Sequence, residues 1–133
     1  MMPSAKSRSG FGRNSGFDDR TGKRLMLYEL RIYHCAPGRL GALNRRFEEV
    51  TLGLWDEFDI RPVGFWTTLV GPSSQTLTYL IRWESMAERE SKWNAFISHP
   101  EWIAARASSE KDGIIVENVE NQLLEPTIYS PMR

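Results

Sequence analysis

Few side chains of this 133-residue chain could carry nucleophilic, metal-binding or neutral-pH proton chemistry. The soft or borderline metal ligands are His34, Cys35 and His99, whereas a zinc site needs three or four ligands. His34 and Cys35 are adjacent, and neighbouring side chains of a strand diverge. We therefore expect no metal site and an ordinary thiol at Cys35. His34 is the one candidate for proton transfer near neutral pH.

Sequence motifs for common cofactors are absent. The chain has no Gly-x-Gly-x-x-Gly motif, no Walker loop and no Gly-x-Ser-x-Gly motif, so dinucleotide, phosphate-loop and α/β-hydrolase chemistry are not indicated. We expect no cofactor.

Aromatic side chains indicate a ligand pocket. Trp66 and Trp83 fall on two runs that we interpret as neighbouring strands. We expect Tyr28, Trp66 and Trp83 to line a pocket for a small hydrophobic ligand, with His34 near its mouth. The alternative interpretation, that these rings only fill the core, stays open.

Charged side chains also fall on the predicted strands. We place Glu29, Arg31, Phe65 and Arg82 on a sheet face that meets a second copy of the chain. Buried charges must be paired, so these residues predict an ion-pair network across a dimer. An anion or carboxylate site in the same place is the alternative.

The elements that position these residues follow from periodicity and from breaking residues. Leu40, Leu43, Phe47, Val50 and Leu54 are spaced as on one helix face, and Ser85 with Glu88 forms a capping box. The expected elements are a strand over 26–34, a helix over 39–58, a hairpin over 61–71 and 76–83, a helix from 86, a short helix over 100–110 and a strand over 114–124.

This order predicts an α+β fold, a ferredoxin-like split βαβ sandwich with one antiparallel sheet and both helices on the same face. The other sheet face carries many apolar side chains. We therefore predict that two copies pack sheet to sheet as a homodimer, forming a dimeric α/β barrel.

Composition divides the chain into two parts. Residues 1–24 are rich in Ser, Gly and Arg and predict a flexible extension, while residues 25–133 form the folded domain. Residues 1–24 hold six Lys/Arg and two Asp, a balance of +4, which leaves −4 for the folded part of a neutral chain. The mildly acidic folded part argues against a nucleic-acid partner. No run approaches the roughly eighteen apolar residues of a membrane span, so we expect none. The single cysteine, Cys35, is compatible with a reducing compartment, and we expect a cytoplasmic protein or, in a eukaryote, a mitochondrial one.

A combination of short segments resembles the NIPSNAP family over about residues 26–131. The segments include Tyr28-Glu-Leu-Arg-Ile-Tyr33, Val63-Gly-Phe-Trp-Thr-Thr68 and Pro100-Glu-Trp102. The resemblance implies a ferredoxin-like monomer that dimerises into an α/β barrel, in a family associated in animals with mitochondria, vesicle traffic and protein interaction. The family pattern of an aromatic residue, two residues and His-Thr is here Phe47-Glu-Glu-Val50-Thr51, so the imidazole is missing.

Two functional hypotheses follow. In the first, the homodimer and its proline-containing tail form a module that binds a protein partner or a small hydrophobic ligand. In the second, the chain is an enzyme similar to the cofactor-free monooxygenases of this fold and acts on a small aromatic substrate through His34, Tyr28 and Trp66. The missing helix histidine favours the first hypothesis.

Overall fold

A computed structural model describes residues 26–133, and the predicted extension over residues 1–24 lies outside them. One four-stranded antiparallel sheet has the strand order β2-β3-β1-β4. Its strands are β1 (Leu27–Cys35), β2 (Arg61–Thr67), β3 (Thr76–Trp83) and β4 (Val116–Leu124). The predicted order of elements and the antiparallel hairpin are confirmed.

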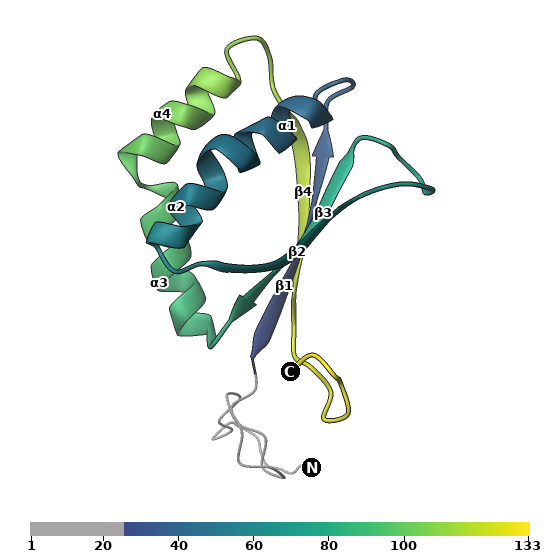
Figure 1. Ribbon diagram of the computed structural model, residues 1–133, viewed down its shortest axis with the longest axis vertical. Coiled ribbons are helices and arrows are strands. Elements are labelled where there is room, and N and C mark those ends of the chain that lie inside the picture. The colour runs from purple at the N-terminus through teal and green to yellow at the C-terminus, as the bar shows by residue number, and fades with distance from the viewer. Residues whose placement is uncertain (1–25) are drawn as a thin grey trace.

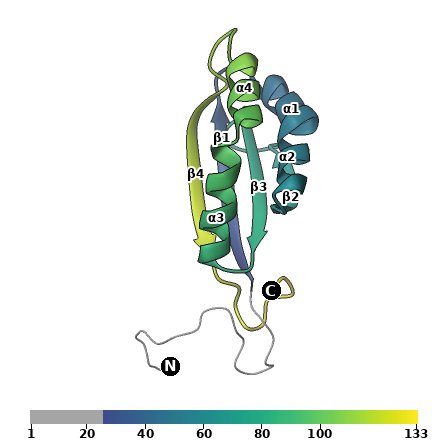
Figure 2. The same cartoon turned by 90° about the vertical axis from the view of Figure 1, so that its left-hand side faces the viewer.

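All helices of the described range lie on one side of the sheet (Figure 1). A continuous helical segment consists of α1 (Leu40–Arg46), a π-helical turn η1 (Phe47–Thr51) and α2 (Leu52–Glu57). The other helices are α3 (Met86–Ile97) and α4 (Pro100–Ser109). Figure 2, viewed from the helical side, shows α3 and α4 beside the α1–α2 segment and in front of the strands. None of the helices within residues 26–133 lies on the opposite face of the sheet.

Two helix starts show why the chain folds locally as it does. The Ser85 hydroxyl accepts a hydrogen bond from the Glu88 backbone N–H at 3.0 Å, which confirms the predicted cap of α3. Pro100 occupies the first turn of α4, and His99 Nδ1 accepts from the Glu101 N–H at 3.1 Å. Both caps satisfy backbone donors that a helix start leaves unpaired.

The π-helical turn interrupts the first helix and was not predicted. The Leu52 N–H bonds to the Phe47 carbonyl, five residues earlier. The Thr51 hydroxyl donates a hydrogen bond at 3.3 Å to the Arg46 carbonyl oxygen, which immediately precedes the π-helical turn. A π-helical turn within an α-helix often marks a functional site.

The two faces of β1 are occupied by different kinds of side chain. Glu29 and Arg31 face the helices, since Arg89 of α3 bonds Glu29 and Trp93 of α3 lies beside the Arg31 guanidinium. Alternation along the strand therefore places Tyr28 and its same-face neighbours Leu30, Ile32 and His34 on the open face.

The predicted assignment of Glu29, Arg31 and Phe65 to the open face was wrong. Phe65 of β2 packs against Phe47 and Trp55, with ring centroids 5.4 and 6.2 Å apart, and so lies under the helices. Alternation shows which residues share a strand face, but it does not show which face the helices cover. Helix α3 decides this, because its Arg89 is the partner of Glu29.

Candidate functional site

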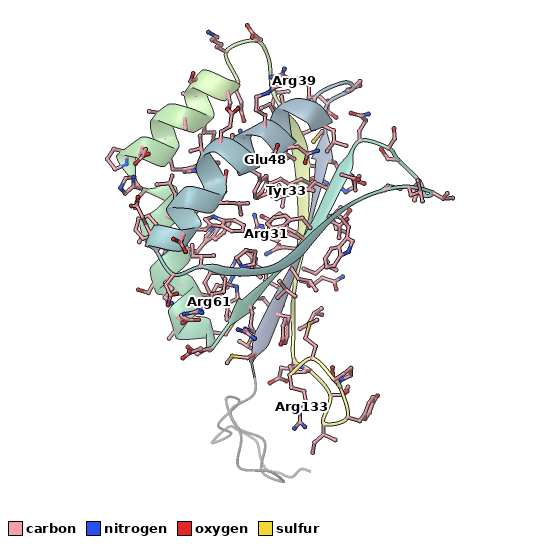
Figure 3. All side chains as sticks on the ribbon, in the orientation of Figure 1. Arg31, Tyr33, Arg39, Glu48, Arg61 and Arg133 are labelled. Carbon is pink, nitrogen blue, oxygen red and sulfur yellow. The ribbon has the colours of Figure 1, made fainter. Side chains whose placement is uncertain are left out.

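A cavity of about 400 Å³ lies between the sheet and the helices. Its walls come from β1, β4, the α1–α2 segment, α3 and α4. Arg31 and Tyr33 of β1 point from the sheet into the space below the helices (Figure 3). The volume falls within the roughly 300–1,000 Å³ that is usual for small-molecule sites.

Flat aromatic rings form much of the wall. Trp55 packs against Trp93 and Phe96 with centroid distances of 6.1 and 6.0 Å. Phe96 and Trp102 lie 4.8 Å apart. The rings belong to three different helices, so the closed helical layer, and not one local motif, creates an apolar surface suited to a flat ligand.

The π-helical turn contributes directly to this wall. Phe47 at its start and Thr51 at its end both line the cavity. Arg46 immediately precedes the turn and lines the cavity too, with its side chain 5% exposed. Its NH1 group donates to Ser109 Oγ and Glu110 Oε2, both at 3.2 Å, and its guanidinium lies 5.2 Å from the Trp102 ring centre.

Two residues that line the cavity each have a buried donor atom without a hydrogen-bond partner among the described residues. These atoms are Arg46 Nε and Trp55 Nε1. Arg46 is 7% exposed and Trp55 is 1% exposed, so water does not replace the missing partners freely. An unpaired buried donor costs about 1–3 kcal/mol.

Arg31 is held in place by a buried carboxylate. Glu29, fully buried, accepts from Arg31 at 2.9 Å and from Arg89 at 2.8 and 2.9 Å. Trp83 Nε1 and Asn121 Nδ2 donate to it at 3.0 Å each. Burial acts to raise the pKa of Glu29, but the hydrogen bonds from Arg89 and Asn121 and the charge of Arg31 outweigh it and lower the pKa to about 2.

A chain of hydroxyl groups leads from Arg31 to the cavity. Arg31 Nε donates to the Tyr79 hydroxyl at 2.9 Å, and Tyr79 donates to the Tyr33 hydroxyl at 2.8 Å. Burial and the neighbouring Tyr33 raise the pKa of Tyr79, so it stays a neutral donor. Tyr33 lines the cavity, and its own hydroxyl hydrogen has no acceptor within the described range. It is therefore free to donate to a ligand.

The predicted pocket residues do not come together. Trp83 is 1% exposed and lies under the helices against Glu29. Tyr28, His34 and Trp66 belong to the open face, as their strand positions show. His34 pairs there with Glu120, and Trp66 is 52% exposed. The cavity instead uses the three other tryptophans, namely Trp55, Trp93 and Trp102.

Arg82 is exposed and opposite Tyr28 in the strand register, which places it on the open face. Cys35 is buried, and burial raises the pKa of its thiol. Across residues 26–133, no three His, Cys, Asp or Glu side chains are grouped so as to hold a metal ion. None of the helices in this range is long and apolar enough to cross a membrane.

Arg46 is one of the cavity residues that the sequence interpretation missed, beside Tyr33 and the three tryptophans. A signal for it existed, because Arg46 lies three residues after Leu43 and four before Val50, on the apolar stripe of the helix. A cation on such a stripe needs a partner. The partner, Glu110, is distant in sequence and supplied by the end of α4.

Comparison with known proteins agrees with the fold. The family model described as NIPSNAP matches residues 28–131. The chain belongs to the NIPSNAP family. None of the curated proteins compared with the chain matches it.

Solved structures share the NIPSNAP architecture. A NIPSNAP family protein of unknown function from Agrobacterium tumefaciens is 21% identical, with a TM-score of 0.72 over 82% of this chain and 95% of the other. An uncharacterized NIPSNAP-like domain protein from Burkholderia xenovorans is 23% identical, with a TM-score of 0.71 over 80% and 89% of the two chains.

A more distant structure is that of a dimeric protein of unknown function and ferredoxin-like fold from Bacteroides fragilis. It is 15% identical to this chain, with a TM-score of 0.52 over 75% of this chain and 95% of the other. These likenesses concern the fold. In this NIPSNAP chain Phe47 and Thr51 line the cavity, whereas Val50, which stands where the resemblance implies histidine, packs against the core.

Proposed function

We propose that the chain is a small-molecule-binding protein, and that its ligand is a flat, largely apolar molecule held in the cavity between sheet and helices. The observation that carries this proposal is the cavity itself, about 400 Å³ in volume and walled by aromatic rings from three helices. A packed core normally leaves few voids larger than a water molecule. A space of this size beside a π-helical turn therefore supports ligand binding over simple core filling.

The uncharged probe 2-naphthamide tests this proposal by isothermal titration calorimetry. We expect it to bind with a dissociation constant below about 1 mM. Ile97→Trp replaces an aliphatic side chain on the cavity wall with a bulky indole, which should fill the space and abolish binding. Ile103→Trp is the matched control, because Ile103 is an exposed isoleucine of the helical layer outside this cavity. Equal binding to both variants, or no binding to the wild type, would refute the proposal.

We also propose that two copies associate through the open sheet face. No helix of the described residues covers this face. It carries Trp66, 52% exposed, with the partly buried Leu30, Ile32 and Leu80. The dimeric relative of ferredoxin-like fold supports a second copy as the occupant, and a two-fold pairing of identical faces is the commonest way to form a dimer.

A charge placed at the centre of this face tests the dimer. Leu80→Arg puts a cation on the central strand β3, and we expect it to produce a monomer in sedimentation velocity runs at micromolar concentration. Ile103→Arg makes the same kind of change on an exposed position of α4 and should leave the dimer intact. A wild-type monomer at these concentrations would refute the association.

A second candidate function is a cofactor-free monooxygenase acting on a small aromatic substrate with dioxygen. The observation that favours it is the Tyr33 hydroxyl, which lines the cavity and receives the Tyr79 hydrogen bond. Such a hydroxyl can exchange a proton with a bound phenol. Dioxygen uptake with a dihydroxynaphthalene should then fall in Tyr33→Phe and not in Tyr28→Phe, since Tyr28 belongs to the open face.

A further inference from the structure

The cavity wall has more hydrogen-bond donors than its own residues use. Arg46 Nε and Trp55 Nε1 are unpartnered within residues 26–133, and both side chains are more than nine-tenths buried. The Tyr33 hydroxyl accepts hydrogen bonds from Arg31 and Tyr79, and its own hydrogen has no acceptor among the described residues, so it is a third donor. Leaving such donors empty is costly, so the geometry calls for a ligand with acceptor atoms.

The charges around the cavity favour an anionic acceptor. Among the lining residues, Arg31, Arg46 and Arg106 stand against Glu110 and Glu117, which leaves one positive charge in excess. Glu29 and Arg89 behind the wall cancel each other and do not change this balance. A positive charge in a partly enclosed cavity attracts an anion more strongly than the same charge in bulk water does.

Arg46 is prepared to receive such a group. Ser109 and Glu110 hold its NH1 group, and the Trp102 ring lies beside the guanidinium, so the side chain needs little further ordering on binding. Its Nε remains for a ligand oxygen. Trp55 follows in the same helical segment. Its ring packs against Phe47 with centroids 5.7 Å apart, and its buried indole N–H has no partner within residues 26–133.

We propose that the natural ligand is a flat aromatic carboxylate. Its ring lies among Trp93, Phe96 and Trp102, and its carboxylate accepts hydrogen bonds from Arg46 Nε and Trp55 Nε1. This inference rests on the proposed binding function and adds the chemical class of the ligand. A carboxylate carries the charge on the acceptor, so its bonds to both the arginine and the indole N–H are charge-assisted and the arginine bond joins opposite charges, which a neutral amide or an amine cannot provide.

Three naphthalene probes of the same shape test the inference by calorimetry: 2-naphthoate, the neutral 2-naphthamide and the cation 2-naphthylmethylamine. We expect 2-naphthoate to bind the wild type at least tenfold more tightly than 2-naphthamide, and the amine to bind weakest. Arg46→Met should weaken naphthoate binding at least tenfold and naphthamide binding less than threefold. Trp55→Phe keeps an aromatic ring at this position, removes the N–H donor and should weaken naphthoate binding selectively.

Matched variants separate a lost contact from a lost fold. Arg45→Met removes the neighbouring arginine, which is exposed and outside this cavity, and should leave all affinities unchanged. Arg46→Lys keeps the charge and should recover part of the naphthoate affinity. Circular dichroism and melting temperature should report whether Arg46→Met still folds. If it does not, Trp55→Phe decides the inference alone.

The outcomes distinguish the ligand class from the binding function. Equal affinity for naphthoate and naphthamide, or equal losses for both in Arg46→Met and Trp55→Phe, would overturn the carboxylate assignment and leave the binding function standing. Absence of binding by all three probes would overturn both. Selective loss of naphthoate in the two cavity variants, with Arg45→Met unchanged, supports the assignment.

Discussion

Glu29→Gln should destabilise the protein strongly at neutral pH. Glu29 is fully buried and accepts hydrogen bonds from Arg31, Arg89, Trp83 and Asn121. The glutamine side chain removes the charge that Arg31 and Arg89 share. It also turns one acceptor into an NH₂ donor among existing donors, so at least one buried hydrogen bond is lost.

The size of the effect follows from the pKa of Glu29. Its ordinary value is 4.5 and the folded value is about 2, which corresponds to about 3 kcal/mol of stabilisation at pH 7. Since the folded pKa is the lower one, this stabilisation is complete above about pH 5. It is lost as the pH falls through 4.5 towards 2. At pH 3 only about 1 kcal/mol of it should remain.

Urea unfolding of both proteins at one fixed protein concentration measures this difference. We expect Glu29→Gln to lose about 3 kcal/mol of unfolding free energy at pH 7 and about 1 kcal/mol at pH 3. Glu90→Gln, at an exposed glutamate of α3, controls for the loss of one carboxylate. A difference below about 1 kcal/mol at pH 7, or one independent of pH, would refute the reasoning.

Three further predictions concern local interactions. Ser85→Ala removes the side-chain acceptor of the Glu88 N–H and should cost about 1 kcal/mol in urea unfolding. Lys92→Met removes ion pairs to Asp59 and Glu88 that lie near the surface, so we expect a loss below about 1 kcal/mol, which falls further in high salt. Cys35 is buried, and burial raises the pKa of its thiol. Its reaction with a disulfide reagent at pH 8 should therefore be at least about tenfold slower in the native protein than in urea. Equal rates would show that the thiol is accessible.

Much of the fold could be predicted because the signals are local. The step of three or four residues from Leu40 to Leu54 predicts a helix, and that segment is helical in the structure. The Ser85 and Glu88 pair predicts the start of α3, and Pro100 predicts the start of α4. Such patterns act over one or two turns and do not depend on the rest of the chain.

The faces of the strands could be predicted only in part. Alternation correctly separated Phe65 from Trp66 and Glu29 from Tyr28, but it placed each pair on the wrong sides of the sheet. Because Tyr28, Leu30 and Ile32 of β1 are apolar, the sequence suggested that this side of the strand faces the core. Instead, the helices cover the charged residues, and hydrogen bonds from Arg89 and Asn121 satisfy the buried carboxylate of Glu29.

The sequence by itself determined the elements, their order, the antiparallel sheet and the scarcity of metal-ligating side chains. Only the tertiary structure decided that Arg46 and Trp55 line one cavity with Tyr33, and that Tyr28, His34 and Trp66 do not. The physical reason is that the cavity depends on contacts between distant segments, such as Arg46 with Glu110 and Arg31 with Tyr79. These contacts leave no periodic signal along the chain. The first forms when α4 packs beside α1, and the second when β1 pairs with β3.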